Sequence, residues 1–556
     1  MPSVFFAPNA VGKRPPRHLV PCLLGTLLAG AASAQTGVWT QHNDNARTGA
    51  NLKESVLNTR NVNARSFGKL FSRKVDGQVY AQPLYVPHVE VPGRGVHNVV
   101  YVATEHNSVY AFDADDPMQP APLWHVNLGP PCPYTDFYTP PQTDMNEEVG
   151  ITGTPVINLD NRALYVVAKS KENGNYVQRL HALDLQSGAE MLGGPVVIQA
   201  AVPGAGDDNV NGVISFNARQ QLQRPGLLLA GGVIYIALGS HGDRDPYHGW
   251  VLGYSAATLK RVAVYNTTPS GGEGAIWQAG QGLSADAQGS LYAVTGNGTA
   301  DAHRGGPDVG ECVIRLDTSG KRLSLADWFL PYNYDALNAA DNDLGSCGAV
   351  LIPNTDLLVC GSKTGTAYVF HRSSLGHFHA DGDTQIVQSF LAANRHIHGS
   401  PITWTDAAGD TFIYLWGEYD NLKAFKLVDG SFQTTPAAQG TTRAPDGMPG
   451  GFLSISADGG KAGTAIVWAT HPADANANWN TVPGTLQAFD ASDVSKELWN
   501  SRQNAARDDL GMFAKFCPPT VVNGKVYVAT FSKQLVVYGL LKPPARHRQA
   551  GGRPRR

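Results

Sequence analysis

The sequence predicts an all-β fold: an eight-bladed β-propeller of four-stranded antiparallel blades, closed by an N-terminal strand in the last blade. Three observations predict it: an eightfold strand-pair pattern, a composition suited to short strands, and an orphan strand ahead of the first copy. The copies begin roughly 53–70 residues apart, at positions 99, 164, 233, 291, 357, 412, 465 and 525. Repetition of this kind is typical of units that bury one another by stacking.

Each copy is an apolar run, a polar break, a second apolar run and a turn, as in VVYVATEHNSVYAFD (99–113). A strand marked by Pro or Gly precedes the pair, as in GITGTPVIN (150–158), and a fourth strand follows, as in PLWHVNL (122–128). Four antiparallel strands repeated radially predict propeller blades. The alternatives are two stacked β domains, or a seven-bladed ring in which one copy is misread.

The composition agrees with many short strands. The 556 residues include 61 Gly and 36 Pro, and only 16% are charged, which suits tight turns between strands. No long segment has the helical period, and no apolar run after the N-terminus is long enough to cross a bilayer. One closed propeller can therefore occupy residues 35–541.

The ends of the repeat predict how the ring closes. The last copy stops after its third strand, at VVYGLL (536–541), while the orphan strand FGKLFSRKV (67–75) precedes the first copy. We expect this orphan to be the outer strand of the last blade, because that pairing removes an exposed edge.

Both chain ends differ from the repeat. Basic residues, the apolar run LVPCLLGTLLAG (19–30) and Ala32-Ser33-Ala34 predict a signal peptide over residues 1–34, and hence a periplasmic or secreted protein. The alternative is an accidental apolar start. The tail, 542–556, is basic and rich in Pro and Gly, so we expect it to be disordered.

The charge between these ends bears on the partners. This part holds 34 basic residues against 46 acidic ones, which argues against a nucleic-acid partner. A small-molecule or polymer substrate is predicted instead, with an electron acceptor or an envelope protein as candidate protein partners.

Five cysteines follow the predicted signal peptide. Cys347 and Cys360 flank a predicted hairpin and can face each other across it; the alternative to a disulfide is two buried free thiols. No CxxCH motif is present, so no covalently attached haem is expected.

Loop lengths predict which face of the ring carries a site. The connections between blades are long, and so are several loops inside the strand pairs, whereas the turns between first and second strands are short. In a four-stranded meander the two long sets emerge on the same side. Function tends to lie on such elaborated loops of a rigid scaffold.

Polar residues of these loops are the candidate site residues. Asp243, His241 and Asp343 are the candidate catalytic residues, because carboxylates and imidazoles transfer protons. Oxygen ligands suit calcium, so Glu148, Asn297 and Asp343 are the candidate metal ligands. Charged and aromatic residues suit an anionic cofactor, for which the candidate ligands are Glu105, His106, Lys169, Arg219, Arg224, Arg244, Trp277, Lys363, His398 and His471.

Simpler roles remain open for the histidines. His396 and His398 are either two metal ligands on one face of a strand or a pair that hydrogen-bonds to backbone. The loop from His241 to His248 is either part of a site or a loop held by its own polar contacts.

The ends of the strand pairs carry a family resemblance. Several segments resemble the repeat of the pyrroloquinoline-quinone (PQQ)-type β-propeller family. They are YAFDADDPMQPAPLW (110–124), HALDLQSGAE (181–190) and QAFDASDVSKELW (487–499). The resemblance covers nearly all of residues 39–541. The family includes quinoprotein alcohol and sugar dehydrogenases and also cofactor-free scaffolds.

The resemblance implies an exported PQQ-dependent-type oxidoreductase that acts on an alcohol, sugar or polyol at the loop-rich face, with PQQ and calcium as cofactors. In the family a Trp stacks on the quinone, calcium is held by Glu, Asn and Asp, and an Asp is the base. The adjacent Cys-Cys pair of the family is missing here. The alternatives are a non-catalytic binding or scaffolding propeller and another enzyme class on the same ring.

Overall fold

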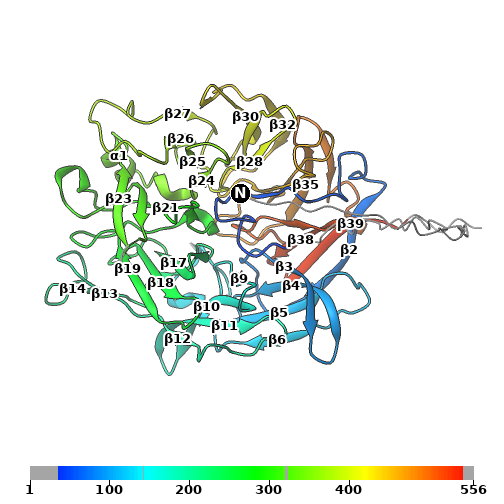
Figure 1. The fold of residues 1–556 in the computed structure, drawn as a ribbon, viewed down its shortest axis with the longest axis horizontal. Helices are drawn as coiled ribbons and strands as arrows, with labels where there is room; N and C mark the ends of the chain where they lie inside the picture. Colours follow the sequence, from blue (N-terminus) through cyan, green and yellow to red (C-terminus); the bar gives the residue numbers. More distant parts are fainter. Residues whose placement is uncertain (1–35, 142, 320–322, 543–556) are drawn as a thin grey trace, which may run out of the picture. The chain divides into compact units, whose positions relative to one another are not determined.

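Eight antiparallel sheets follow one another along the chain and form the predicted ring of blades (Figure 1). The computed structural model describes residues 36–141, 143–319 and 323–542. The predicted signal peptide and all but the first residue of the predicted tail lie outside the described residues. The eight sheets confirm the eight-bladed propeller over the two alternatives.

The first four blades are each built from consecutive strands. Blade 1 has β3 (Leu84–Val91), β4 (Gly95–Ala103), β5 (Ser108–Asp113) and β6 (Trp124–Asn127); blade 2 has β9 (Val156–Asn158), β10 (Ala163–Glu172), β11 (Asn175–Asp184) and β12 (Val196–Val197). Blade 3 has β15 (Gln221–Leu222), β16 (Leu228–Ala230), β17 (Val233–Ser240), β18 (Trp250–Ser255) and β19 (Arg261–Asn266); blade 4 has β20 (Ser284–Ala285), β21 (Leu291–Val294), β22 (Val313–Asp317) and β23 (Ser324–Phe329).

The next three blades follow the same order. Blade 5 has β24 (Val350–Leu351), β25 (Leu357–Gly361), β26 (Thr366–His371) and β27 (Gln388–Leu391); blade 6 has β28 (Ile402–Thr405), β29 (Thr411–Leu415), β30 (Asn421–Val428), β31 (Ser431–Phe432) and β32 (Ala438–Arg443). Blade 7 has β33 (Phe452–Ser456), β34 (Ile466–Pro472), β35 (Gly484–Asp490) and β36 (Glu497–Asn500).

Smaller elements lie in the connections. They are the strand pairs β7 (Cys132–Pro133) with β8 (Glu148–Val149) and β13 (Ala201–Pro203) with β14 (Val213–Ser215), and the helices α1 (Tyr334–Ala339) and α2 (Ala505–Asp508). None of the helices in the described ranges is long and apolar enough to span a membrane.

Blade 8 closes the ring as predicted. Its strands β37 (Thr520–Val522), β38 (Lys525–Thr530) and β39 (Gln534–Leu540) are joined by β2 (Phe67–Lys74) from the N-terminal end. β2 runs antiparallel to β39, with Phe67 opposite Leu540 and Lys74 opposite Gln534. In Figure 1 the blue β2 accordingly lies beside the red β39.

The repeated tyrosine of the second strands ties each of several blades to the next. Its side chain lies in the core, and its hydroxyl donates to a carbonyl that follows the third strand of the neighbouring blade. This arrangement explains why the copies read VYVA, LYVV and IYLW. The pairs are Tyr101 to Leu185 (2.9 Å), Tyr165 to Ala256, Tyr414 to Ala491 (2.8 Å) and Tyr527 to Ala114 (3.2 Å).

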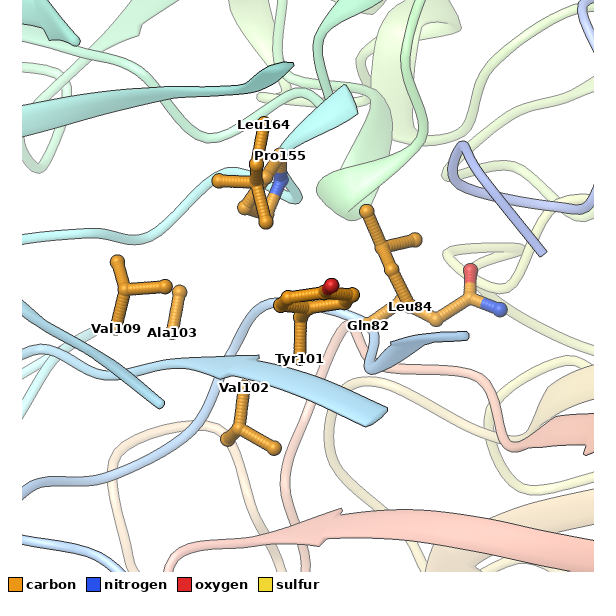
Figure 2. Close-up of a pocket in the computed structure, with 8 residues that line it drawn as sticks. All are labelled: Gln82, Leu84, Tyr101, Val102, Ala103, Val109, Pro155 and Leu164. Carbon is orange, nitrogen blue, oxygen red and sulfur yellow. The ribbon is translucent and has the colours of Figure 1, made fainter. Parts of the chain in front are cut away.

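Figure 2 shows how tightly two blades pack around one of these tyrosines. Leu84, Tyr101, Pro155 and Leu164 border a gap between blades 1 and 2. The space that a water molecule could occupy in this gap is about 0 Å³. The gap is therefore part of the packed core and not a binding site.

An unpredicted feature is the segment 38–54, here called the belt, which contacts all eight blades. It includes β1 (Ala50–Asn51), which pairs with β33 in parallel. The other contacts reach the ends of first strands, next to the short turns. They join Val38 to Tyr85, Trp39 to Ile157, Asn45 to Leu229 and Ala285, Ala46 to Leu351, Thr48 to Thr403, Gly49 to Ile455, and Glu54 to Gly524.

The belt occupies the centre of the ring at the face with the short turns. Arg47 is 0% exposed there, and its guanidinium donates to the carbonyls of Gln41, Leu227 and Leu283 and to the hydroxyl of Thr40. The blue trace at the middle of Figure 1 is this segment. The ring is thus closed at this end by its own chain.

The structure places the five cysteines of the described residues as buried free thiols, Cys347 and Cys360 among them. The Cys347 sulfur instead accepts a hydrogen bond from the Gly361 amide at 3.0 Å. Of the two possibilities for this pair, the structure has the free thiols.

Candidate functional site

A polar cavity of about 600 Å³ lies at the end of the ring opposite the belt. Both sets of long loops contribute to its wall, as expected from their lengths: those between blades and those after the second strands. Seven predicted site residues line it: Arg224, Asp243, Arg244, Trp277, Asp343, Lys363 and His398. The cavity is the candidate active site.

One wall holds a lysine between two carboxylates. Lys363 Nζ lies 2.5 Å from Asp341 Oδ1 and 2.5 Å from Asp343 Oδ2. Burial disfavours the ammonium, but the two carboxylates outweigh it and hold the pKa of Lys363 above its ordinary value. The ammonium therefore stays charged at the cavity surface.

Asn297 contacts both carboxylates of this wall but does not itself line the cavity. Its backbone amide donates to Asp343 Oδ1 at 2.7 Å, and its side-chain Nδ2 donates to Asp341 Oδ1 at 3.0 Å. The remaining side-chain atom, Oδ1, is buried and has no hydrogen-bond partner in the described residues. An orphaned amide oxygen beside a carboxylate is a donor set that suits a hard cation.

The third predicted metal ligand lies elsewhere. Glu148 contacts His106, whose Nδ1 is 3.0 Å from Glu148 Oε1, and neither residue lines the cavity. In the described ranges no three His, Cys, Asp or Glu side chains converge as metal ligands. Asn297 and Asp343 are brought together, and Glu148 is not.

Trp277 lies against two glycines at the cavity floor. A Cβ on Gly239 would approach Trp277 Cε3 to 2.8 Å, and one on Gly296 would approach Trp277 Cδ1 to 2.8 Å and Asp343 Oδ1 to 2.2 Å. Only glycine fits at these positions. This explains the glycines at position 239 of ALGSHG (237–242) and position 296 of TGNG (295–298).

Arg224 joins Trp277 to a buried charge network. Its guanidinium carbon is 5.0 Å from the Trp277 ring centroid, and its Nη1 is 3.5 Å from Asp144 Oδ2. Lys515 Nζ is 3.0 Å from Asp144 Oδ1. Burial favours the neutral acid, but Lys515 and Arg224 outweigh it and lower the pKa of Asp144. An ionised Asp144 thereby holds Arg224 over the indole.

Asp243 has no such partner. It adopts a left-handed backbone conformation with φ of 49°, and its carboxylate forms no hydrogen bond with the described residues. Although the side chain is exposed to the cavity, the surrounding protein and the nearby Asp343 raise the pKa of Asp243 to about 7. A carboxylate of this kind can exchange a proton near neutral pH.

The adjoining stretch of wall carries two histidines and a glutamate, since the Ile397 amide donates to the Ser362 carbonyl next to Lys363. His398 is 3% exposed, and its ring nitrogens have no hydrogen-bond partner in the described residues. His396 Nδ1 lies 3.3 Å from Glu418 Oε2, and the two imidazole rings are 5.5 Å apart. Burial, followed by His396, Lys363 and Arg224, lowers the pKa of His398 well below its ordinary value. A neutral His398 thus offers one donor and one acceptor.

Other predicted residues lie behind the cavity wall. His241 is 1% exposed and is held between Tyr138 and Lys169. Glu105 is 0% exposed and accepts from the Gly150 amide at 2.6 Å. Burial raises the pKa of Glu105 to about 8.

Two of the predicted cofactor ligands have local contacts instead. His471 Nδ1 lies 2.7 Å from the Pro472 carbonyl and Nε2 lies 2.8 Å from Gln487 Oε1. Arg219 donates to the Asp136 carbonyl at 3.1 Å. Neither residue lines the cavity.

Several cavity residues carry no signal in the sequence beyond the length of their loops. Tyr138, Asp144, Asp446 and Trp479 line the cavity from the long connections or a long strand-pair loop. Loop length was the only signal for them, because none belongs to a motif.

The fold of the chain is similar to that of several solved structures. A quinohemoprotein alcohol dehydrogenase from Pseudomonas putida HK5 shares 14% identity, with a TM-score of 0.53 over 92% of this chain and 81% of that one. The quinohemoprotein alcohol dehydrogenase from Comamonas testosteroni shares 15%, with a TM-score of 0.53 and the same coverage. A europium-containing methanol dehydrogenase shares 14%, with a TM-score of 0.54 over 91% and 98%.

No family model and no curated protein sequence matches the chain. At identities this low, the likeness to the solved structures is one of fold. The chain therefore shares the β-propeller fold of these structures.

Proposed function

We propose that this chain is an exported PQQ-dependent-type oxidoreductase, periplasmic or secreted, that oxidises an alcohol, sugar or polyol in the cavity. The observation that carries the proposal is that Trp277, Lys363 and Asp343 line one 600 Å³ cavity at the loop-rich end of the ring, with Asn297 hydrogen-bonded to Asp343. The fold likeness to quinohemoprotein alcohol dehydrogenases and to a methanol dehydrogenase supports the same activity.

The residues present fit such a cofactor. PQQ is planar and carries three carboxylates, which an indole face and the cations Lys363, Arg224 and Arg244 suit. The orphaned Asn297 Oδ1 and the Asp343 carboxylate are the residues that would hold calcium. When bound, the quinone supplies the oxidising power by accepting two electrons from the substrate.

The chain's own residues orient the substrate and manage its proton. Lys363 fixes Asp343 by an ion pair at the cavity surface, so its carboxylate is oriented before any ligand enters. Asp243, with a pKa raised to about 7, is the candidate base for the substrate hydroxyl. His241 is buried, so it does not contact a substrate directly.

Reconstitution with PQQ and calcium tests the proposal. We expect the purified chain to bind the quinone, with quenched tryptophan fluorescence, and to reduce a redox dye when given members of an alcohol, sugar and polyol panel. Asp343→Asn should abolish dye reduction, whereas Asp317→Asn, on the remote strand β22, should not. If the protein binds no quinone and reduces no dye, the proposed oxidoreductase activity is wrong.

A further inference from the structure

A hydrogen-bonded chain of three side chains leads from the cavity into the wall between blades 2 and 3. Tyr138 lines the cavity, and its hydroxyl is 2.9 Å from His241 Nδ1. His241 Nε2 is in turn 2.7 Å from Lys169 Nζ. Phe137 stacks on the imidazole at 4.1 Å between ring centroids, which holds the ring in this plane.

Lys169 is satisfied in either charge state. Besides His241, its Nζ contacts the carbonyls of Arg219 at 2.7 Å and Gln221 at 3.1 Å. An ammonium has three N–H donors, which match His241 and the two carbonyls. A neutral amine has two donors for the carbonyls and one lone pair, which accepts from His241. Both protonation states therefore keep every contact.

The protonation state of Lys169 determines the donor–acceptor direction of each hydrogen bond in this series of three side chains. An ammonium donates to His241 Nε2, so Nδ1 carries the imidazole proton and donates to the Tyr138 oxygen. The Tyr138 hydrogen then points away from His241. A neutral Lys169 instead accepts from Nε2–H, and Nδ1 accepts the Tyr138 hydroxyl hydrogen. The Tyr138 oxygen then presents a lone pair to a ligand.

We propose that Tyr138, His241 and Lys169 form a proton relay that takes one proton from a ligand hydroxyl in the cavity and stores it on Lys169. The ligand O–H bond breaks as a new Tyr138 O–H bond forms. The former Tyr138 proton moves to His241 Nδ1, and the Nε2 proton moves to Lys169. The ligand becomes an alkoxide and Lys169 an ammonium, and no electrons are transferred.

The charges around the relay suit this role. Burial lowers the pKa of Lys169 to about 7; Cys132 and Glu105 oppose the shift, and Arg219 adds to it. Burial, then Lys169, Arg224 and Arg244, lowers the pKa of His241 well below its ordinary value, so the imidazole stays neutral. Burial raises the pKa of Tyr138, and the negative charges of Asp144, Glu105 and Asp243 raise it further. Arg224 opposes this shift without cancelling it, so the hydroxyl stays protonated.

The relay rests on the proposed function only for the identity of the proton donor, an alcohol hydroxyl. Tyr138 is the catalytic residue of the three, because it alone lines the cavity in which the ligand would bind. His241 and Lys169 act through it as positioning residues. The relay provides a second route for the substrate proton besides Asp243.

The tautomer of His241 tests the relay without substrate or quinone. In ¹⁵N-histidine-labelled protein, the His241 resonances are those lost in His241→Gln. We expect the imidazole proton on Nδ1 at about pH 5.5 and on Nε2 at about pH 8.5, on either side of the Lys169 pKa of about 7. A tautomer that does not change over this range overturns the relay.

Two variants separate the members of the chain. Lys169→Met should leave one His241 tautomer at all pH values in this range. Tyr138→Phe should keep the pH-driven change, because Lys169 still selects the tautomer, but should lower kcat for alcohol oxidation at least 10-fold with little change in KM. A pH-driven change that survives Lys169→Met contradicts the relay, as does full kcat in Tyr138→Phe. Loss of dye reduction in the wild type contradicts only the proposed function.

Discussion

Two buried polar side chains, one at each end of the ring, differ in how they are hydrogen-bonded. At the belt end, Arg47 is 0% exposed, and each nitrogen of its guanidinium donates to an oxygen of the protein. At the cavity end, His398 is 3% exposed, and its ring nitrogens have no partner in the described residues. Both side chains are buried, but only that of Arg47 has a hydrogen-bond partner for each of its nitrogens.

The difference between these two residues indicates which is structural and which is available to a ligand. A buried donor or acceptor without a partner costs free energy, so such an atom calls for a specific explanation, for example a ligand that pairs with it. At the cavity end such atoms are Asn297 Oδ1 and both ring nitrogens of His398, and the belt has one as well, Nδ1 of His42. Arg47 therefore stabilises the fold, and the His398 imidazole keeps hydrogen-bonding capacity for a ligand.

The largest expected effect comes from removing the arginine of the belt. Arg47→Met leaves the carbonyls of Gln41, Leu227 and Leu283 without their donor, so we expect the free energy of unfolding to fall by about 3–5 kcal/mol. Urea denaturation followed by tryptophan fluorescence measures it. Arg65→Met, at an exposed position, is the control and should change stability by less than about 0.5 kcal/mol. Equal effects of the two variants would show that the belt does not stabilise the ring.

The next effect depends on pH and concerns Glu105, which lies behind the cavity wall. Burial raises the pKa of Glu105 to about 8, so the folded protein holds this proton at pH values where the unfolded chain releases it. Its contribution to stability is complete below the unfolded pKa and is lost as pH rises through about 8. Glu105→Gln mimics the protonated acid, so the variant should gain about 2–4 kcal/mol relative to wild type between about pH 5 and pH 8.

Unfolding midpoints at several pH values measure this relative gain. Glu172→Gln is the control, because its ion pair with Arg179 lowers the pKa of Glu172 and leaves it charged throughout this range. Parallel pH profiles for Glu105→Gln and wild type would mean that Glu105 is ionised in the folded protein.

A smaller effect is expected from filling the close approach beside Asp343. In Gly296→Ala the new Cβ would lie 2.2 Å from Asp343 Oδ1, so the carboxylate must move. We expect a loss of about 1–3 kcal/mol in stability and weaker quinone binding. Gly440→Ala, whose Cβ meets nothing closer than 3.5 Å, is the matched control. Unchanged quinone binding in Gly296→Ala would argue against Asp343 as part of the site.

The blades were predictable because their signal is local and repeated. Each strand pair is two apolar runs of the right length. The orphan strand before the first copy and the missing fourth strand of the last copy implied the pairing of β2 with β39. The belt was not predictable, since it is polar and has no period. Its partners are distant in sequence: the Val521 carbonyl, which accepts a hydrogen bond from the Asn51 side chain, is 470 residues away.

The candidate site was predictable only to the level of the face. Position in or beside the long loops of one face identified Asp343, Lys363 and His398, which line the cavity. The same rule selected His241 and Lys169, whose side chains point between blades instead. Which way a side chain points depends on the packing of two neighbouring blades, and the sequence of one blade does not contain that information.

The smallest expected effect is the sharpest test of the comparison between the two ends. His398 and His471 are both 3% exposed, but the His471 ring nitrogens lie 2.7 and 2.8 Å from protein oxygens. His398→Gln should therefore change the free energy of unfolding by less than about 1 kcal/mol, and His471→Gln should cost about 1–3 kcal/mol. Urea titrations of the two variants side by side measure the difference. If His398→Gln lowers the free energy of unfolding as much as His471→Gln does, the imidazole of His398 is structural. It is then not an unpaired group available to a ligand.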